Sequence, residues 1–202
     1  MFRITALAVA VGLVSAAPAA RADIITENLG GTGGSPNGLA FGQSLVTPAG
    51  GPWHDLTFNF FSNSPATTPT AAGTAFLLSK EYLGTPANLN SSTPGFLAAS
   101  TGIVGGQYDF APSVTVQPHM PYWVYENVSI GRISGDNAVS GIHYYDSTGS
   151  SFEGSSNSVN FRFSGDVVTS TSPVPAPPAA VLVGLGAGCV VLKRYVHRRA
   201  TA

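Results

Sequence analysis

Cysteine is almost absent from this chain of 202 residues, which contains only Cys189. That residue lies in an apolar stretch near the C-terminus, so the long region before it cannot form an internal disulfide. The same count excludes a catalytic thiol and a Cys-ligated zinc site from that region. Its stability must therefore come from the packing of a hydrophobic core.

Charge is scarce as well, since Asp, Glu, Lys and Arg together make up 9% of the chain. Six of the nine basic residues lie in the segments 1–22 and 172–202, and all ten acidic residues lie between them. The region between therefore has three basic residues against ten acidic ones, a net charge of about −7. Nucleic acid and anionic lipid both require clustered Lys and Arg, so we expect neither as a partner of this region.

Motifs for catalysis are missing too. The chain has no G-x-S-x-G sequence, which a nucleophilic serine hydrolase would place at a strand-to-helix turn. His54, His119 and His143 do not follow an H-x-x-x-H or H-E-x-x-H spacing, and polar or surface positions explain them better than metal ligation. We therefore predict no catalytic residues and no enzymatic activity.

Aspartate residues in loops leave a calcium site open as an alternative. Asp109, Asp136 and Asp146 could supply the hard oxygen ligands that Ca²⁺ prefers, although none begins a D-x-[DN]-x-[DN]-G loop. No other cofactor is expected. A surface adhesin stabilised by Ca²⁺ is accordingly one possible function.

The first 22 residues have the three regions of a secretory signal peptide. A positive charge near the start precedes an apolar core at residues 6–15, and Ala20 and Ala22 give the small-x-small form of a signal-peptidase site. We expect signal peptidase to cleave after Ala22, which leaves Asp23 as the mature N-terminus.

The last thirty residues combine a proline-rich segment, an apolar run and a basic cluster. Proline cannot continue a helix interior, so residues 172–178 should form a stiff linker. Residues 179–192 carry no charge, and we predict a short transmembrane helix over 179–196 followed by a cytoplasmic tail at 197–202. The basic residues that would hold this orientation are Lys193, Arg194, Arg198 and Arg199.

This order of elements resembles the PEP-CTERM sorting signal of exported bacterial proteins, which are substrates of exosortase-type enzymes. The corresponding motif here is Val174, Pro175, Ala176 and Pro177, with alanine at the position where the family usually has glutamate. The resemblance implies cleavage near this motif and delivery to the cell surface or to an exopolysaccharide matrix. A plain C-terminal membrane anchor with a proline-rich spacer is the alternative.

The middle region, residues 23–171, shows short strands and turns with almost no helical period. Leu56, Phe58 and Phe60 alternate with polar residues, and residues 122–130 are rich in aromatic and β-branched side chains. Residues 28–38 look like a loop or a loose edge, and residues 135–137 look like a tight turn. The other predicted strands are 40–47, 73–82, 107–110, 113–116, 138–145 and 160–168, and residues 96–100 form either a strand or a single turn.

These features predict an all-β domain, an antiparallel β-sandwich of jelly-roll-like size. The sequences at 41–45, 56–60 and 118–125 also resemble the β-sandwich ectodomains that often precede PEP-CTERM tails. Those domains mostly have no assigned activity, so the resemblance concerns the fold.

Aromatic residues suggest glycan binding as a further alternative, because aromatic faces beside polar loops can stack on sugars. Alternation places Trp123 and Tyr125 on one face of their strand and Tyr122 on the other, and we expect at least one of Trp123 and Tyr122 to be buried. The candidate platforms are Trp53, Tyr122, Trp123, Tyr125, Tyr144 and Tyr145.

Taken together, the sequence predicts an exported, non-enzymatic protein of the cell surface or extracellular matrix. Its expected partners are the membrane through the C-terminal helix, signal peptidase, an exosortase-like enzyme and, in the glycan-binding alternative, exopolysaccharide.

Overall fold

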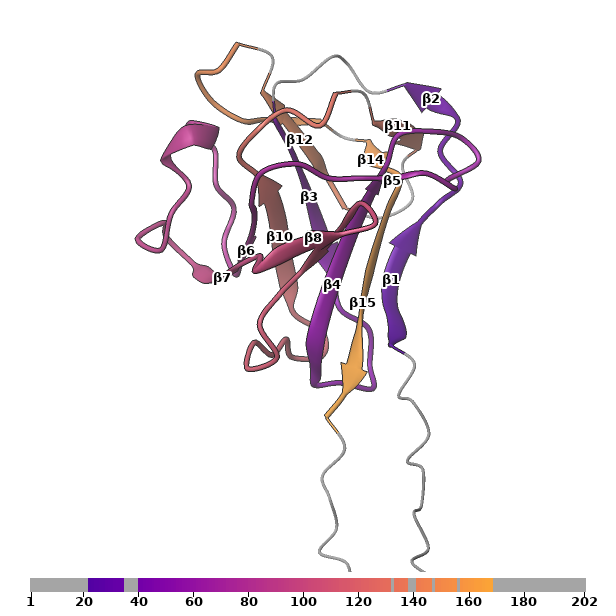
Figure 1. The fold of residues 1–202 in the computed structure, drawn as a ribbon, viewed down its shortest axis with the longest axis vertical. Helices are drawn as coiled ribbons and strands as arrows, with labels where there is room; N and C mark the ends of the chain where they lie inside the picture. The colour runs from indigo at the N-terminus through magenta and orange to yellow at the C-terminus, as the bar shows by residue number, and fades with distance from the viewer. Residues whose placement is uncertain are drawn as a thin grey trace, which may run out of the picture. The chain divides into compact units, whose positions relative to one another are not determined.

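Two antiparallel sheets form the body of the domain and face each other across a shared core (Figure 1). The computed structural model describes residues 22–34, 40–131, 133–137, 141–146, 148–155 and 157–168, which all belong to one compact unit ending at Val168. The all-β antiparallel sandwich predicted above is confirmed.

The first sheet contains six strands, and the second sheet also contains six. In spatial order, the first sheet consists of β1 (Asp23–Asn28), β15 (Phe161–Val167), β4 (Trp53–Phe61), β9 (Gln107–Asp109) and β8 (Gly102–Val104), with β5 (Pro69–Thr70) paired to β4. The second sheet consists of β13 (Glu153–Ser155), β12 (His143–Asp146), β3 (Ala40–Val46), β10 (Pro121–Glu126), β6 (Ala75–Leu78) and β7 (Phe96–Ala99).

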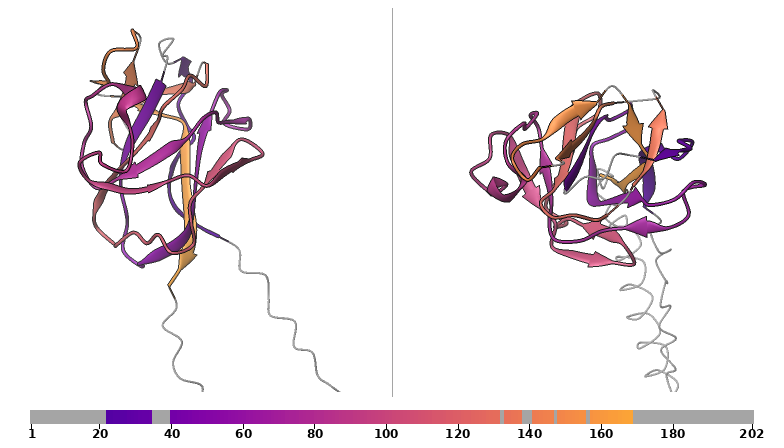
Figure 2. Two further views of the ribbon diagram at one scale, coloured as in Figure 1. Left: turned by 60° about the vertical axis from the view of Figure 1, so that its left-hand side comes forward. Right: turned by 90° about the horizontal axis from the view of Figure 1, so that it is seen from above.

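A small third sheet and a single helical turn complete the described part of the chain. The third sheet orders β14 (Ser158–Val159), β11 (Ser134–Asn137) and β2 (Gly33–Gly34). The 3-10 helix η1 (Pro86–Asn88) lies in the loop between β6 and β7, which stands outside the second sheet (Figure 2). Within the described residues, no helix is long and apolar enough to cross a bilayer.

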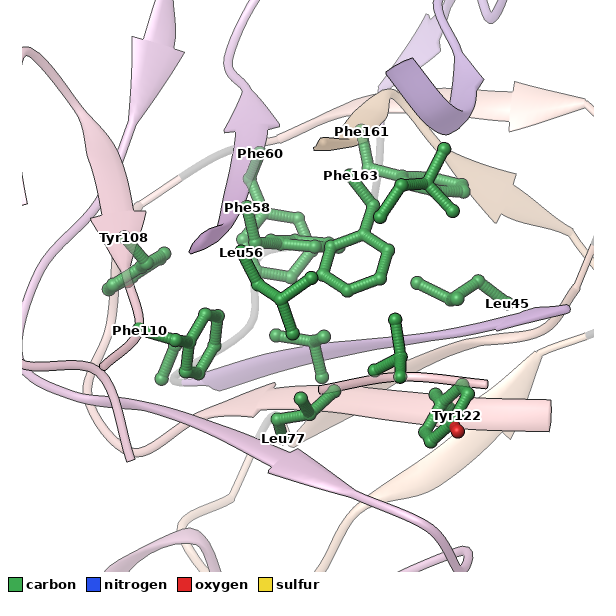
Figure 3. Close-up of a cluster of buried hydrophobic side chains, with 14 of the residues drawn as sticks. Leu45, Leu56, Phe58, Phe60, Leu77, Tyr108, Phe110, Tyr122, Phe161 and Phe163 are labelled. Atoms are coloured by element: carbon green, nitrogen blue, oxygen red, sulfur yellow. The ribbon is translucent and has the colours of Figure 1, made fainter. Parts of the chain in front are cut away.

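The main core fills the space between the first two sheets. Leu56, Phe58 and Phe60 on β4 are fully buried, as their alternation predicts. Phe58 stacks on Phe161 with ring centroids 5.8 Å apart and meets Phe60 edge-on at 4.9 Å. Figure 3 shows these rings gathered on one side of the core, with side chains such as Leu77 opposite them.

A second cluster covers the outer face of the second sheet, so that this sheet is buried on both sides. Tyr82 and Leu89 from the loop between β6 and β7, together with Phe152, pack against Tyr125 and Tyr144. The rings of Tyr125 and Phe152 lie 4.7 Å apart, and the hydroxyl of Tyr125 accepts a hydrogen bond from the backbone N–H of Tyr82 at 3.1 Å. This loop is therefore packed against the outer face of the second sheet.

Several predicted elements differ from the structure. The tight turn expected at 135–137 is wrong, because these residues belong to β11 and pair with both β14 and β2. Residues 23–28, which have few apolar side chains, form β1 by pairing with β15. The strand expected over 122–130 ends at Glu126. The buried carboxylate of Glu126 accepts from the backbone N–H of Phe41 on β3, and Asn127 Oδ1 accepts from the backbone N–H of Thr74.

The targeting segments predicted from the sequence lie almost entirely outside the described residues. This applies to residues 1–21 of the predicted signal peptide 1–22, to the motif at 174–177, to the helix at 179–196, and to Lys193, Arg194, Arg198 and Arg199. Of those positions, only Ala22 is described, and it is exposed.

Candidate functional site

Four of the six aromatic residues predicted as glycan platforms are buried. Trp53 and Tyr122 belong to the main core with exposures of 4% and 5%, and Tyr125 and Tyr144 belong to the outer cluster with exposures of 0% and 1%. Rings as deeply buried as these cannot stack on a sugar, so burial excludes these four candidates as glycan platforms. The burial of Tyr122 confirms the expectation that at least one of Trp123 and Tyr122 lies in the core.

Trp123 and Tyr145 are only partly buried. Tyr145 packs against the main core, whereas Trp123 packs against the outer cluster. The indole N–H of Trp123 donates to the hydroxyl of Tyr144 at 3.1 Å, and that hydroxyl donates to Glu81 Oε1 at 2.7 Å. Burial, together with the hydrogen bond to Glu81, raises the pKa of Tyr144 to about 12, so it remains a donor at neutral pH. Trp123 is thus one partly exposed ring whose polar atom already has a partner within the protein.

The three aspartates considered for calcium belong to strands of three different sheets. Asp109 lies on β9 of the first sheet and Asp146 at the end of β12 in the second, while Asp136 belongs to β11 of the third. Among the described residues, no group of three or more His, Cys, Asp or Glu could hold a metal ion.

The histidines also lie apart from one another. His54 Nδ1 is 2.5 Å from Asp55 Oδ2, and His143 Nδ1 is 2.7 Å from the backbone oxygen of Asn157. His119 lies in the loop before β10 with φ of 58°. Among the described residues, none of these histidines belongs to a group of three or more His, Cys, Asp or Glu that could hold a metal ion.

A polar face on the outside of the first sheet is the strongest candidate site that the structure shows. Because Phe58, Phe161 and Phe163 point into the core, their neighbours in sequence point outward. The pairing of β1, β15, β4, β9 and β8 then sets these neighbours in two rows across the sheet. One row is Glu27, Arg162 and Asn59, and the other is Ile24, Ser164, Thr57, Asp109 and Gly102.

This face is hollowed into a groove of about 510 Å³. Its floor includes Asn59 and Ser164, which are only 6% and 8% exposed although they point away from the core. The groove is lined by Ala22, Asp23, Ile24, Thr57, Asn59, Gln107, Arg162 and Ser164. We refer to these eight residues as the polar groove.

Hydrogen bonds hold the side chains around the polar groove in place. Arg162 Nε donates to Glu27 Oε2 at 2.7 Å, and Gln107 Nε2 donates to Asp109 Oδ1 at 2.8 Å. Amides, hydroxyls, a guanidinium and a carboxylate therefore line one concavity, and each has further donor or acceptor capacity. These groups can donate to and accept from the polar atoms of a ligand.

Sequence reasoning placed Thr57 on the outer face of its strand but did not find the groove. The groove depends on β1, which the sequence pattern did not reveal, and on the register of four strands that are distant in the chain. The alternating polar residues on β4 and β15 are the only sequence feature found here that points to this polar face. Many sheets with one solvated face show the same alternation, so it does not predict a groove.

The fold and this face define the chain as an antiparallel β-sandwich with a polar groove on the outer face of its first sheet. Comparison with protein-family models, with curated proteins and with solved structures finds no match.

Proposed function

We propose that this chain is an exported, non-enzymatic protein of the cell surface or extracellular matrix, delivered by its two terminal signals. The observation that carries the proposal is the fit between the sandwich and those signals. β1 begins at Asp23, directly after the expected cleavage at Ala22, and β15 ends at Val167, before the linker at 172–178. Cleavage at both sites would release the sandwich without cutting a strand.

Both ends of the sandwich also lie together. Asp23 pairs with Gly165 in the first sheet, so the first strand and the last strand are neighbours. We expect a jelly-roll-like ectodomain in which both cleavage sites lie next to the paired first and last strands. Such a domain can be held by its C-terminal segment and released by a cut outside the sheets. PEP-CTERM-type processing at 174–177 by an exosortase-like enzyme is the route that we propose for this release.

Deleting residues 179–192 tests the sorting route. We expect the deletion to shift the protein from the cell envelope into the medium, because the apolar segment that would retain it is gone. Immunoblots of fractionated cells measure the shift, and replacing Arg198 and Arg199 with alanine should act in the same direction. The intact mass of wild-type protein from surface material should correspond to a chain that begins at Asp23 and ends near the proline motif. An unchanged location after the deletion would contradict the proposal.

The polar groove favours a second candidate function, the binding of a neutral glycan. Planar amides and hydroxyls at fixed positions match the donors and acceptors of sugar hydroxyls. Asp23, Glu27 and Asp109 outnumber Arg162 on this face, so uronate-containing polymers should bind less well than neutral ones. The volume of about 510 Å³ falls within the range of small-ligand sites.

Replacing Gln107 with alanine tests glycan binding at the groove. The variant loses one donor and acceptor group at the rim, and we expect about five- to tenfold weaker affinity for a neutral oligosaccharide such as cellohexaose. Titration calorimetry gives the affinities, with an alginate hexasaccharide as the anionic comparison.

Trp123→Phe is the matched control, because Trp123 lies on the outer face of the other sheet. It should leave the affinity unchanged. If Trp123→Phe abolishes binding while Gln107→Ala has no effect, the groove is not the site. If wild type binds no neutral glycan on an array, the second candidate function is wrong.

A further inference from the structure

An uncharged edge runs along one side of both large sheets. The chain passes from β7 in the second sheet to β8 in the first at two consecutive residues. The backbone N–H of Ser100 donates to β6, and the backbone N–H of Thr101 donates to β9. In the described part of the chain, β7 and β8 are each the last strand of their sheet. We refer to residues 96–104 as the β7–β8 edge.

The β7–β8 edge lacks the features that usually keep the edge of a sheet from pairing with another chain, namely charged side chains and proline. Other edges have such charges, since β1 contains Asp23 and Glu27 and β13 contains Glu153. By contrast, the sequence has no charged residue between Glu81 and Asp109, and the β7–β8 edge has no proline. Alternate residues of an edge strand point their backbone N–H and C=O groups away from its neighbour, so β8 can hydrogen-bond to a further strand.

Apolar side chains are exposed along this edge. Val104 is 70% exposed, Ile103 40% and Leu97 39%. Ile103 pairs with the buried Tyr108 and faces the core side, so Gly102 and Val104 lie on the outer face of the first sheet. A Cβ atom at Gly102 would meet no other atom within 4 Å. On its outer face, β8 therefore combines a projecting valine with an open space two residues away.

We propose that the β7–β8 edge binds a second copy of this chain, with the two β8 strands antiparallel and Ile103 opposite the partner's Ile103. Residues directly opposite each other in an antiparallel pair have their side chains on the same face. This register therefore places the partner's Val104 over the open space at Gly102, and two-fold symmetry repeats the contact with the roles exchanged.

Charge also favours a second copy at this edge. The region between the terminal segments has a net charge of about −7, so two copies repel each other over most of their surface. Approach along the β7–β8 edge brings together strands that carry no charge. A strand of an unrelated protein would need side chains that happen to match Gly102 and Val104, whereas a second copy supplies the match by symmetry.

The contact is small, because β8 has three residues and few side chains flank it. We expect it to bury less than about 1,200 Å² in total, the size of weak and transient complexes. The corresponding dissociation constant is about 10 to 100 µM. This inference is independent of both the sorting route and the polar groove.

Sedimentation equilibrium of the exported protein, from about 1 to 500 µM, tests the self-association. We expect a monomer–dimer equilibrium in wild type and at least about tenfold weaker association in Val104→Asp, which places a carboxylate near the partner's Asp109. Because Val104 is exposed, this variant should unfold at the wild-type temperature.

Val46→Asp is the matched control. Val46 is also an exposed valine at a strand end, at 63%, but β10 and β6 separate its strand β3 from β7. The control variant should associate as wild type does. The inference is overturned if wild type stays monomeric over the whole concentration range, if Val104→Asp associates as tightly as wild type, or if Val46→Asp weakens the dimer as much as Val104→Asp.

Ile103→Cys tests the register, in a Cys189→Ala background that leaves no other thiol. Directly opposite Cα atoms of an antiparallel pair lie about 4.5 to 5.5 Å apart, which falls within the range for a disulfide. Mild oxidation should therefore yield a covalent dimer on a non-reducing gel, whereas Val46→Cys in the same background should remain monomeric. Cross-linking of Val46→Cys without cross-linking of Ile103→Cys would contradict the proposed pairing.

Discussion

Replacing Glu126 with leucine should lower the free energy of unfolding by about 3 kcal/mol, because several buried donors lose their acceptor at once. Glu126 is completely buried at the end of β10. Its Oε1 accepts from the backbone N–H of Phe41 at 3.0 Å, and the carboxyl group also accepts from the backbone N–H of Ile130. Leucine has a similar size but cannot accept any of these bonds.

The hydrogen bonds around Glu126 leave a place for a proton on its carboxyl group in the folded protein. The hydroxyl of Tyr108 lies 3.1 Å from Glu126 Oε2 and 2.8 Å from the backbone oxygen of Ala72, and it has one proton for these two acceptors. If Glu126 carries a proton, it can donate to Tyr108 while Tyr108 donates to Ala72. Burial likewise raises the pKa of Glu126 well above its ordinary value, against the smaller opposing effect of its hydrogen bonds.

Glu126→Gln should therefore fold well and change how stability depends on pH. Because the pKa of Glu126 is raised in the folded state, its protonation contributes to the free energy of unfolding. This contribution is complete below the ordinary glutamate pKa and is lost as pH rises toward the folded-state pKa. The slope is at most about 1.4 kcal/mol per pH unit. Glutamine has no carboxyl group to ionise, so this contribution disappears, and its amide can still donate to Tyr108 and accept from Phe41.

Urea unfolding at several pH values between 4.5 and 8 measures both effects. The stability of Glu126→Gln relative to wild type should improve as pH rises. A constant difference between the two proteins across this range would show that Glu126 has an ordinary pKa. If Glu126→Leu proved as stable as wild type, the buried hydrogen bonds described for this carboxyl group would be wrong.

The fold class could be predicted because it depends on local patterns. Alternation along residues 56–60 and 122–125 correctly assigned the two faces of β4 and β10, since a strand repeats every two residues whatever its partner. Two strands, β1 and β11, could not be predicted from alternation, because they form by hydrogen bonding to partner strands. β1 and β11 have few apolar side chains, and only β15, β14 and β2, which are distant in the sequence, make them strands.

The candidate sites were harder to predict because they depend on contacts between distant segments. Nothing in the local sequence indicates that the loop between β6 and β7 covers the outer face of the second sheet and buries Tyr125 and Tyr144. Gly42 illustrates the same limit. It reads as an ordinary strand residue, yet a Cβ atom there would lie 2.3 Å from the ring of Tyr125, which pairs with it from β10. Only the folded structure shows why this position has no side chain.

Replacing Phe58 with alanine should lower the free energy of unfolding by about 3 to 5 kcal/mol, the usual effect of removing a fully buried aromatic ring. Phe58 is 0% exposed, and its ring centroid lies within 6.2 Å of those of Phe60, Phe161 and Phe163. These rings come from both β4 and β15, so a cavity here loosens the centre of the first sheet (Figure 3). Phe58→Leu retains most of the volume and should have a smaller effect.

Thr57→Ala is the matched control for this prediction, because Thr57 is the adjacent residue on the same strand but faces the polar groove. Its expected effect is within about 0.5 kcal/mol, as for other substitutions outside the core. Because side chains alternate along a strand, a register shift of one residue would exchange the two positions. Urea unfolding of both variants therefore tests the register of β4 against β15. A larger loss for Thr57→Ala than for Phe58→Ala would contradict the sheet pairing and, with it, the polar groove on the outer face.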